Sequence, residues 1–207
     1  IADLITKAVT EVGAEGSVIV ENAKGYKSDL AIVEGLQLNR GYTSPYFIND
    51  QDKMMCNFEK CLVLLINKKI ETIKDIIKPL ETALQQEKQI LIIANDIEDE
   101  ALQGLVMNKL KGNLKVCMIK SPGFGAGRHD MMCDMSCITG AKMFGHSDSL
   151  NDFTETDFGT VKKVMISRNS SLIVANNDKR VDIESRISKI KMHLQENIFE
   201  EEELELV

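Results

Sequence analysis

Apolar positions along the chain follow two different periods. Short apolar runs, typical of buried strands, occur at residues 17–20, 30–33, 61–66, 90–94, 114–119, 164–166 and 172–174. Apolar residues at helical spacing occur over residues 4–12, around 70–86 and 98–110, from about 128, and over a stretch with Ile183, Ile187, Ile190 and Leu194. This alternation predicts an α/β fold with mixed β-sheets flanked by helices.

The predicted helix at residues 98–110 carries more apolar residues than a helix on a sheet needs. At about 100° per residue its apolar positions cover an arc of roughly 240°, whereas packing on a sheet takes a stripe of about 100°. Charged residues such as Glu98 and Lys111 disfavour burial on all sides. A core stripe with some surplus is one interpretation, and we favour a second apolar contact surface. The apolar positions are Ala101, Leu102, Leu105, Val106, Met107 and Leu110.

Pro79 interrupts the helical pattern at residues 70–86. Inside a helix, proline removes a backbone donor and clashes with the preceding turn, whereas it is tolerated at a helix start. We therefore expect an irregular stretch at residues 73–77 and a new helix that starts near Pro79.

Three aromatic residues, Tyr42, Tyr46 and Phe47, lie within six residues around Pro45. Each of them taken singly is consistent with a core anchor. On a turn-rich loop, however, three neighbouring side chains cannot all point inward. We therefore expect some of these aromatic side chains to face outward.

Composition narrows the classes of protein. With 207 residues, 43% hydrophobic and 28% charged, the chain fits one domain of ordinary size or slightly more. A net charge of −7 disfavours nucleic-acid binding, and the absence of a run of about 18 apolar residues disfavours a membrane span. Five cysteines, an odd number, favour a reducing compartment over a disulfide scaffold. The chain begins at Ile1 rather than Met, inside a predicted helix, so we expect a fragment or a processed protein.

Four segments resemble, in order, signatures of the group I (GroEL-type) chaperonins. Residues 34–49 (EGLQLNRGYTSPYFIN) resemble the family's entry into the apical domain, and KKI at 68–70, IIANDIEDEAL at 92–102 and KSPGFG at 120–125 resemble later signatures. The resemblance covers nearly the whole chain. It implies a partial intermediate domain at residues 1–34 and an apical domain at residues 35–207, whose last helix leads back to the intermediate domain. Gly35 matches the family's hinge glycine, and the backbone freedom of glycine suits a hinge.

The resemblance also implies a function and a site. The family is a group of molecular chaperones that bind non-native polypeptides and the mobile loop of a co-chaperonin through an apolar groove. The surplus apolar stripe at residues 98–110 coincides with that groove. Pro79 stands one position later than the family's proline, and Ala126 to His129 replace the acidic or polar residue and paired basic residues usual there. The matching binding residues are Tyr42, Tyr46, Phe47, Ile77, Leu80, Leu102, Val106, Met107 and Asn108.

Further expectations follow from the same resemblance. ATP and Mg²⁺ belong to the intact chaperonin, so we expect no catalytic residue, cofactor or metal in this chain. The intact protein is expected to form homo- or hetero-oligomeric rings, and this chain alone to be monomeric, without nucleic-acid or membrane partners. The expected location is an organelle matrix, in a mitochondrion or plastid, or a bacterial cytoplasm.

Two other readings stay open. Residues 123–128 (GFGAGR) follow a predicted strand and precede a predicted helix, as in a dinucleotide-binding enzyme, but Arg128 stands where a small residue is required. His129, Cys133 and Cys137 recur every four residues on one helical face and have the chemistry of zinc ligands, but no fourth ligand is evident. We favour a plain glycine-rich turn and unligated thiols.

Overall fold

The structure is a computed structural model that describes residues 2–12, 35–176 and 181–192. The chain divides into two compact units, Ile1–Glu34 and Gly35–Val207. The first unit contains helix α1 (Ala2–Val12), as its helical spacing of apolar residues predicts. The apolar runs at residues 17–20 and 30–33 lie outside the described residues.

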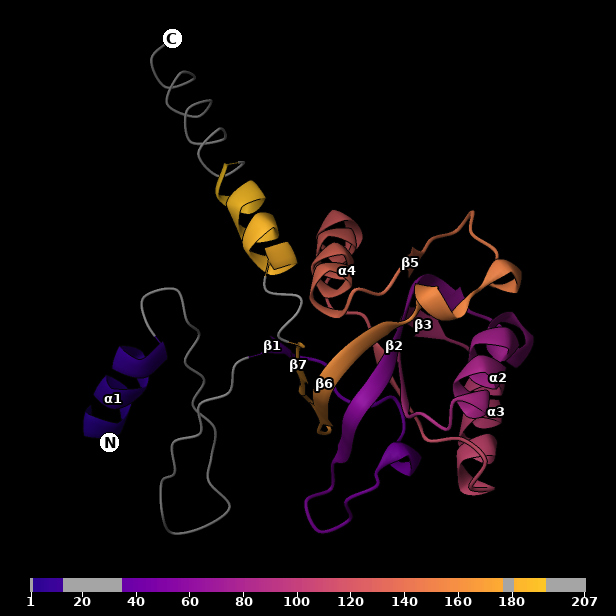
Figure 1. Cartoon of the computed structure of the whole chain (residues 1–207). Helices are drawn as coiled ribbons and strands as arrows, with labels where there is room; N and C mark the ends of the chain where they lie inside the picture. The colour runs from indigo at the N-terminus through magenta and orange to yellow at the C-terminus, as the bar shows by residue number, and fades with distance from the viewer. Residues whose placement is uncertain (1, 13–34, 177–180, 193–207) are drawn as a thin grey trace. The chain divides into compact units, whose positions relative to one another are not determined.

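The second unit is built on one mixed sheet of seven strands (Figure 1). The strands run in the order β1-β7-β6-β2-β3-β4, and β5 pairs with β2 beside this path. β3, β4 and β5 run parallel to β2, whereas β2, β6, β7 and β1 form an antiparallel series. An α/β fold with a mixed sheet is therefore confirmed. The strands are β1 (Leu36–Leu38), β2 (Cys56–Ile70), β3 (Ile90–Ile97), β4 (Val116–Lys120), β5 (Met143–Phe144), β6 (Gly159–Ile166) and β7 (Ser171–Val174).

Helices cover both faces of the parallel part of the sheet. They are α2 (Ile77–Gln85), α3 (Asp99–Leu110) and α4 (Gly125–Thr139). The steps β2 to β3 to β4 proceed in one direction, so right-handed crossovers place α2 and α3 on the same face. The chain then returns to β5 beside β2, which puts α4 on the opposite face, as Figure 1 shows. A further helix spans residues 181–192.

The core lies between these layers and is apolar. The strands β2, β3 and β4 are covered on both faces, which explains their nearly continuous apolar runs. Cys56, Cys61 and Cys117 are buried in this core as free thiols, and burial raises the pKa of Cys61 to about 12. These cysteines behave as small hydrophobic residues. Among the described helices, none is long and apolar enough to cross a bilayer.

Several boundaries differ from the predicted ones. Helix α2 begins at Ile77 rather than near Pro79, and residues before it form a 3₁₀ helix, η2 (Ile73–Ile76), rather than an irregular stretch. Pro79 is the third residue of α2, where the backbone N–H has no intrahelical acceptor, so the proline breaks no helical hydrogen bond. Helix α4 begins at Gly125 rather than near residue 128. Strand β2 extends beyond residues 61–66 at both ends, because β6 pairs with its first half and β3 pairs with Lys69 and Ile70 at its end.

Candidate functional site

The aromatic segment lies along the edge of the sheet formed by β4. Tyr42 forms a β-bridge with Ile119, and the backbone N–H of Thr43 donates to the carbonyl oxygen of Met118 at 3.0 Å. The 3₁₀ helix η1 (Pro45–Phe47) follows, with Pro45 at its first position. Tyr46 is 62% exposed, whereas Phe47 is completely buried. Tyr42 is half-buried against the core. Of the three aromatic residues, Tyr46 therefore faces outward, as expected for some of them.

Helix α3 has apolar side chains on its inner and its outer side. Ala101 and Leu105 are fully buried and Val106 is 9% exposed, whereas Met107 is 52% and Leu110 60% exposed. Leu102 is partly buried against the core, and the side-chain amide of Asn108 donates to the carbonyl oxygen of Gly104 at 2.9 Å. Ala101 and Leu105 are therefore buried and Met107 is exposed, as their angular positions predict, but Val106 is buried more deeply than Leu102, although its angular position lies further from the sheet.

Helix α2 likewise exposes apolar side chains. Ile77 and Leu84 are each 47% exposed, whereas Leu80 is only 7% exposed. We call the exposed residues Tyr46, Ile77, Leu84, Met107 and Leu110 the α2–α3 surface. Sequence analysis did not assign Leu84 and Leu110 to the site. The signal for Leu110 was its place in the surplus arc of α3, whereas Leu84 looked like part of an ordinary core stripe.

Both helices contact η2, which directly precedes α2 in the chain. A Cβ atom at Gly104 of α3 would lie 2.9 Å from Cδ1 of Ile73 in η2, closer than such atoms approach. The glycine therefore lets α3 approach η2 closely. As a result, α2 and α3 expose their apolar side chains on neighbouring parts of the same layer.

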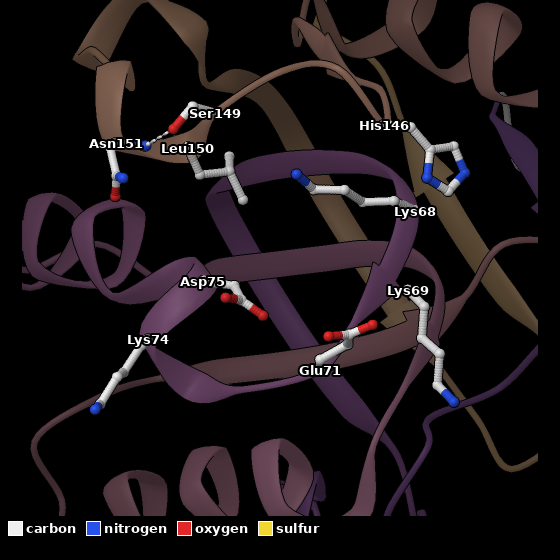
Figure 2. Close-up of a pocket in the computed structure, with 9 residues that line it drawn as sticks. All are labelled: Lys68, Lys69, Glu71, Lys74, Asp75, His146, Ser149, Leu150 and Asn151. Carbon is white, nitrogen blue, oxygen red and sulfur yellow. Dashed lines mark hydrogen bonds between the residues drawn. The ribbon is translucent and has the colours of Figure 1, made fainter.

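A polar pocket of about 500 Å³ lies beside this layer (Figure 2). In Figure 2, residues 146 and 149–151 line one side and the end of β2 with η2 lines the other. The Lys68 ammonium donates to the carbonyl oxygen of Asp148 at 2.8 Å, and Lys69 forms an ion pair with Glu98 that raises the pKa of Lys69. Charges of both signs line the pocket, and Lys68 links the end of β2 to the loop that carries the residues on the other side.

The glycine-rich turn has the strand–turn–helix context of a dinucleotide site but not its packing. Cβ atoms at Gly125 and Gly127 would meet nothing within 4 Å, so neither glycine is needed for close approach of helix and strand. Gly125 instead has a positive φ of 56°. Arg128 folds back, and its Nε donates to the carbonyl oxygen of Gly123 at 3.2 Å. This geometry favours a plain turn closed by Arg128.

The candidate zinc ligands lie along α4. Nε2 of His129 is 3.6 Å from Sγ of Cys133, and Nδ1 of His129 is 3.3 Å from the side-chain amide of Asn67. Burial is the largest cause that raises the pKa of Cys133, and a raised pKa disfavours the thiolate that a metal requires. Within the described parts of the chain, no three His, Cys, Asp or Glu residues are grouped to hold a metal ion.

Gly35 stands at the boundary between the two units. A Cβ atom there would lie 2.6 Å from the carbonyl oxygen of Ile173 in β7. The close approach of this strand is therefore the structural reason for a glycine. The hinge role of Gly35 stays a prediction.

Comparison with known proteins supports the resemblance of the motifs. No family profile matches the chain. The chain is 40% identical over 193 residues to the RuBisCO large subunit-binding protein subunit beta-1 of Chlamydomonas reinhardtii, a member of the chaperonin 60 family. The aligned region is 92% of this chain and 44% of that protein, so the chain spans less than half the length of this relative. Within the aligned region, the chain belongs to the group I chaperonins.

Proposed function

We propose that this chain is the part of a chaperonin that binds non-native polypeptides, and that it does so through the α2–α3 surface. The observation that carries the proposal is the exposure of large apolar side chains on two neighbouring helices, from 47% at Ile77 to 60% at Leu110. Burying such surface is favourable by about 25 cal/mol per Å², partly offset by the entropy lost on binding. Apolar segments that an unfolded protein exposes would supply the complementary surface.

The chemistry of this surface suits a broad choice of clients. Met107 is unbranched and polarizable, so it adapts to differently shaped partners. Amphipathic helices and extended segments are both plausible ligands for two neighbouring apolar helices. The more deeply buried members of the predicted site, Phe47, Leu80 and Val106, would support the surface from beneath. Tyr42, Leu102 and Asn108 are half-buried and would contact a client at the margin.

The family suggests further partners. A co-chaperonin mobile loop would use the same surface, because it too presents apolar side chains to the groove. We propose that the full-length protein forms rings, binds ATP and Mg²⁺, and works inside a cell or organelle. This chain alone is then monomeric and binds clients without nucleotide.

A matched pair of variants tests the assignment. Met107→Ser on α3 and Met131→Ser on α4 each replace an exposed methionine, 52% and 43% exposed respectively. The readout is the affinity for a fluorescently labelled, permanently unfolded client, measured without nucleotide. Met107→Ser should weaken binding by about tenfold, the equivalent of about 1.4 kcal/mol of lost apolar contact, and Met131→Ser should leave it unchanged. Equal affinities for both variants and the unmodified chain would reject the α2–α3 surface.

An assay of phosphate release tests whether ATP hydrolysis requires parts of the full-length protein other than this chain. We expect no ATP turnover by the chain alone. Turnover that persists through purification and is unaffected by Met107→Ser would contradict the proposal.

A further inference from the structure

The segment that carries Tyr46 is fixed to the sheet at both ends. Before η1, the backbone N–H and the hydroxyl of Thr43 both donate to the carbonyl oxygen of Met118, at 3.0 and 3.2 Å. After η1, the side chain of Asn49 exchanges two hydrogen bonds with the backbone of Asn57, at 2.7 and 2.8 Å. The middle of the segment, which exposes Tyr46, packs instead against α3.

Lys109 of α3 holds that middle part. Its ammonium donates to the carbonyl oxygen of Tyr46 at 2.6 Å and to that of Ile48 at 2.9 Å. These carbonyl groups lie at the C-terminal end of η1, where the last carbonyl groups have no hydrogen-bond donor within the helix. Phe47, between the two acceptors, is completely buried. One charged side chain and one buried ring thus fix the turn from which Tyr46 projects.

The surroundings of Lys109 make these hydrogen bonds consequential. Burial of its side chain is the largest cause that lowers the pKa of Lys109. A partly buried ammonium forms stronger hydrogen bonds than one in water. A neutral, apolar side chain at this position would leave both carbonyl groups without their partner, which is costly where water has limited access.

We propose that Lys109 is a positioning residue for polypeptide binding, which holds Tyr46 next to α3 without itself contacting the client. The inference rests on the proposed function of the α2–α3 surface. The sequence alone gives no sign of this role, because a lysine near the end of a helix is usually solvated. The position of Tyr46 next to α3 therefore depends on a side chain of α3 itself.

The test compares three variants with the unmodified chain. Lys109→Met keeps the length of the side chain and removes its donors, Lys109→Arg keeps donors, and Lys111→Met changes an exposed lysine two residues further on. Two quantities are measured: the affinity for the labelled unfolded client, and the hydrogen exchange of the Phe47 and Ile48 amides, which donate within η1. We expect Lys109→Met to weaken client binding by about three- to tenfold and to speed this exchange. Lys109→Arg should retain most of the affinity and most of the protection from exchange. Lys111→Met should change neither quantity.

A double-mutant cycle separates positioning from general stabilisation. In a Tyr46→Ala background, Lys109→Met should cause no further loss of affinity, because the side chain that it positions is gone. Additive losses, or unchanged affinity and exchange in Lys109→Met alone, would overturn the proposal. If Lys109→Met does not fold, Lys109→Gln, which keeps one donor group, takes its place in the same cycle.

The exchange measurement also distinguishes a failure of the proposed function from a failure of the proposed role of Lys109. It requires no client, so it reports whether Lys109 fixes η1 even if the chain binds none. Faster exchange in Lys109→Met combined with no binding by the unmodified chain would refute the proposed function while retaining the contact. Unchanged exchange combined with Met107-dependent binding would refute only the role of Lys109.

Discussion

Helices α3 and α4 cover opposite faces of one sheet and differ in what they show to solvent. Their inner sides are alike: Leu105 of α3 and Met135 of α4 are both fully buried. On the outer side, α4 exposes Met131 at 43% and also presents Asp134, which forms an ion pair with Arg186 of helix 181–192 at 2.7 Å. Helix α3 presents Met107 and Leu110 instead, more than half exposed.

This difference separates residues that form the fold from residues that serve another purpose. One buried stripe is sufficient to attach a helix to a sheet, as α4 demonstrates. The outer apolar residues of α3 do not contribute to that attachment, and exposed apolar surface lowers solubility. Their presence therefore calls for a partner, whereas the ion pair of α4 does not.

The largest expected effect comes from truncating one apolar side chain on the inner side of α3 and, separately, one on its outer side. Leu105→Ala should lower the free energy of unfolding by roughly 2–5 kcal/mol, because a fully buried leucine leaves a cavity. Met107→Ala should cost less than about 1 kcal/mol, because half of the side chain is already in water. Urea denaturation followed by circular dichroism measures both. Equal losses would mean that the outer stripe of α3 belongs to the core.

The sequence predicted helix α3 and its outer apolar residues better than it predicted the short strands and the contacts between distant residues. The periodicity of residues 98–110 gave both the helix and the surplus stripe, because angular position alone determines which side of a helix a residue occupies. Strands β1 and β5 were missed because three and two residues are too few to show an alternating pattern. The hydrogen bonds of Lys109 to η1 could not be predicted, because they join residues 61 and 63 positions apart.

The aromatic segment shows the same limit for the candidate site. Tyr46 and Phe47 are neighbours with similar side chains, yet one is 62% exposed and the other is completely buried. The motif identifies both residues, but only the packing of η1 against α3 decides which one can touch a partner. Family resemblance thus located the segment, and its geometry distinguished the residues within it.

Residues at the margin between the two sides of α3 test where the core ends. Val106 is 9% exposed, so Val106→Ser should cost about 1–3 kcal/mol of stability and also weaken client binding. Leu102→Ser should cost less, because Leu102 is only partly buried. The measurement pairs a urea denaturation with a client titration for each variant. If both variants unfold the domain as severely as Leu105→Ala, neither residue belongs to the binding surface.

On the α4 side, the contact with helix 181–192 can be weakened separately. Arg186→Met removes the hydrogen bond to Asp134, which also raises the pKa of Arg186. Partly exposed ion pairs contribute below about 1 kcal/mol, so the global transition should hardly move. Faster hydrogen exchange within residues 181–192 should be the measurable effect. Client binding should be unchanged, because the α2–α3 surface lies on the other face of the sheet; weaker binding would contradict the separation of the two faces.

The smallest expected effect lies at the carboxyl ends of β3 and β4, the strands between the two layers. Asp96 and Lys120 form an ion pair at 2.6 Å, and the hydrogen bond from Lys120 is the largest cause that lowers the pKa of Asp96. A lowered pKa means that the pair stabilises the fold above the ordinary pKa of about 3.9 and ceases to do so as the pH falls through the lower, folded value. Both side chains are about half exposed, so the contribution should stay below about 1 kcal/mol. Lys120→Met should raise the pKa of Asp96, which a carboxyl NMR titration measures. The rise should be only partial, because the backbone N–H of Ile97 still donates to the Asp96 carboxylate at 2.8 Å. The difference in unfolding free energy between the unmodified chain and the Lys120→Met variant should shrink below about pH 4 and in high salt. A difference that grows on acidification would show that Lys120 acts through packing rather than through its charge.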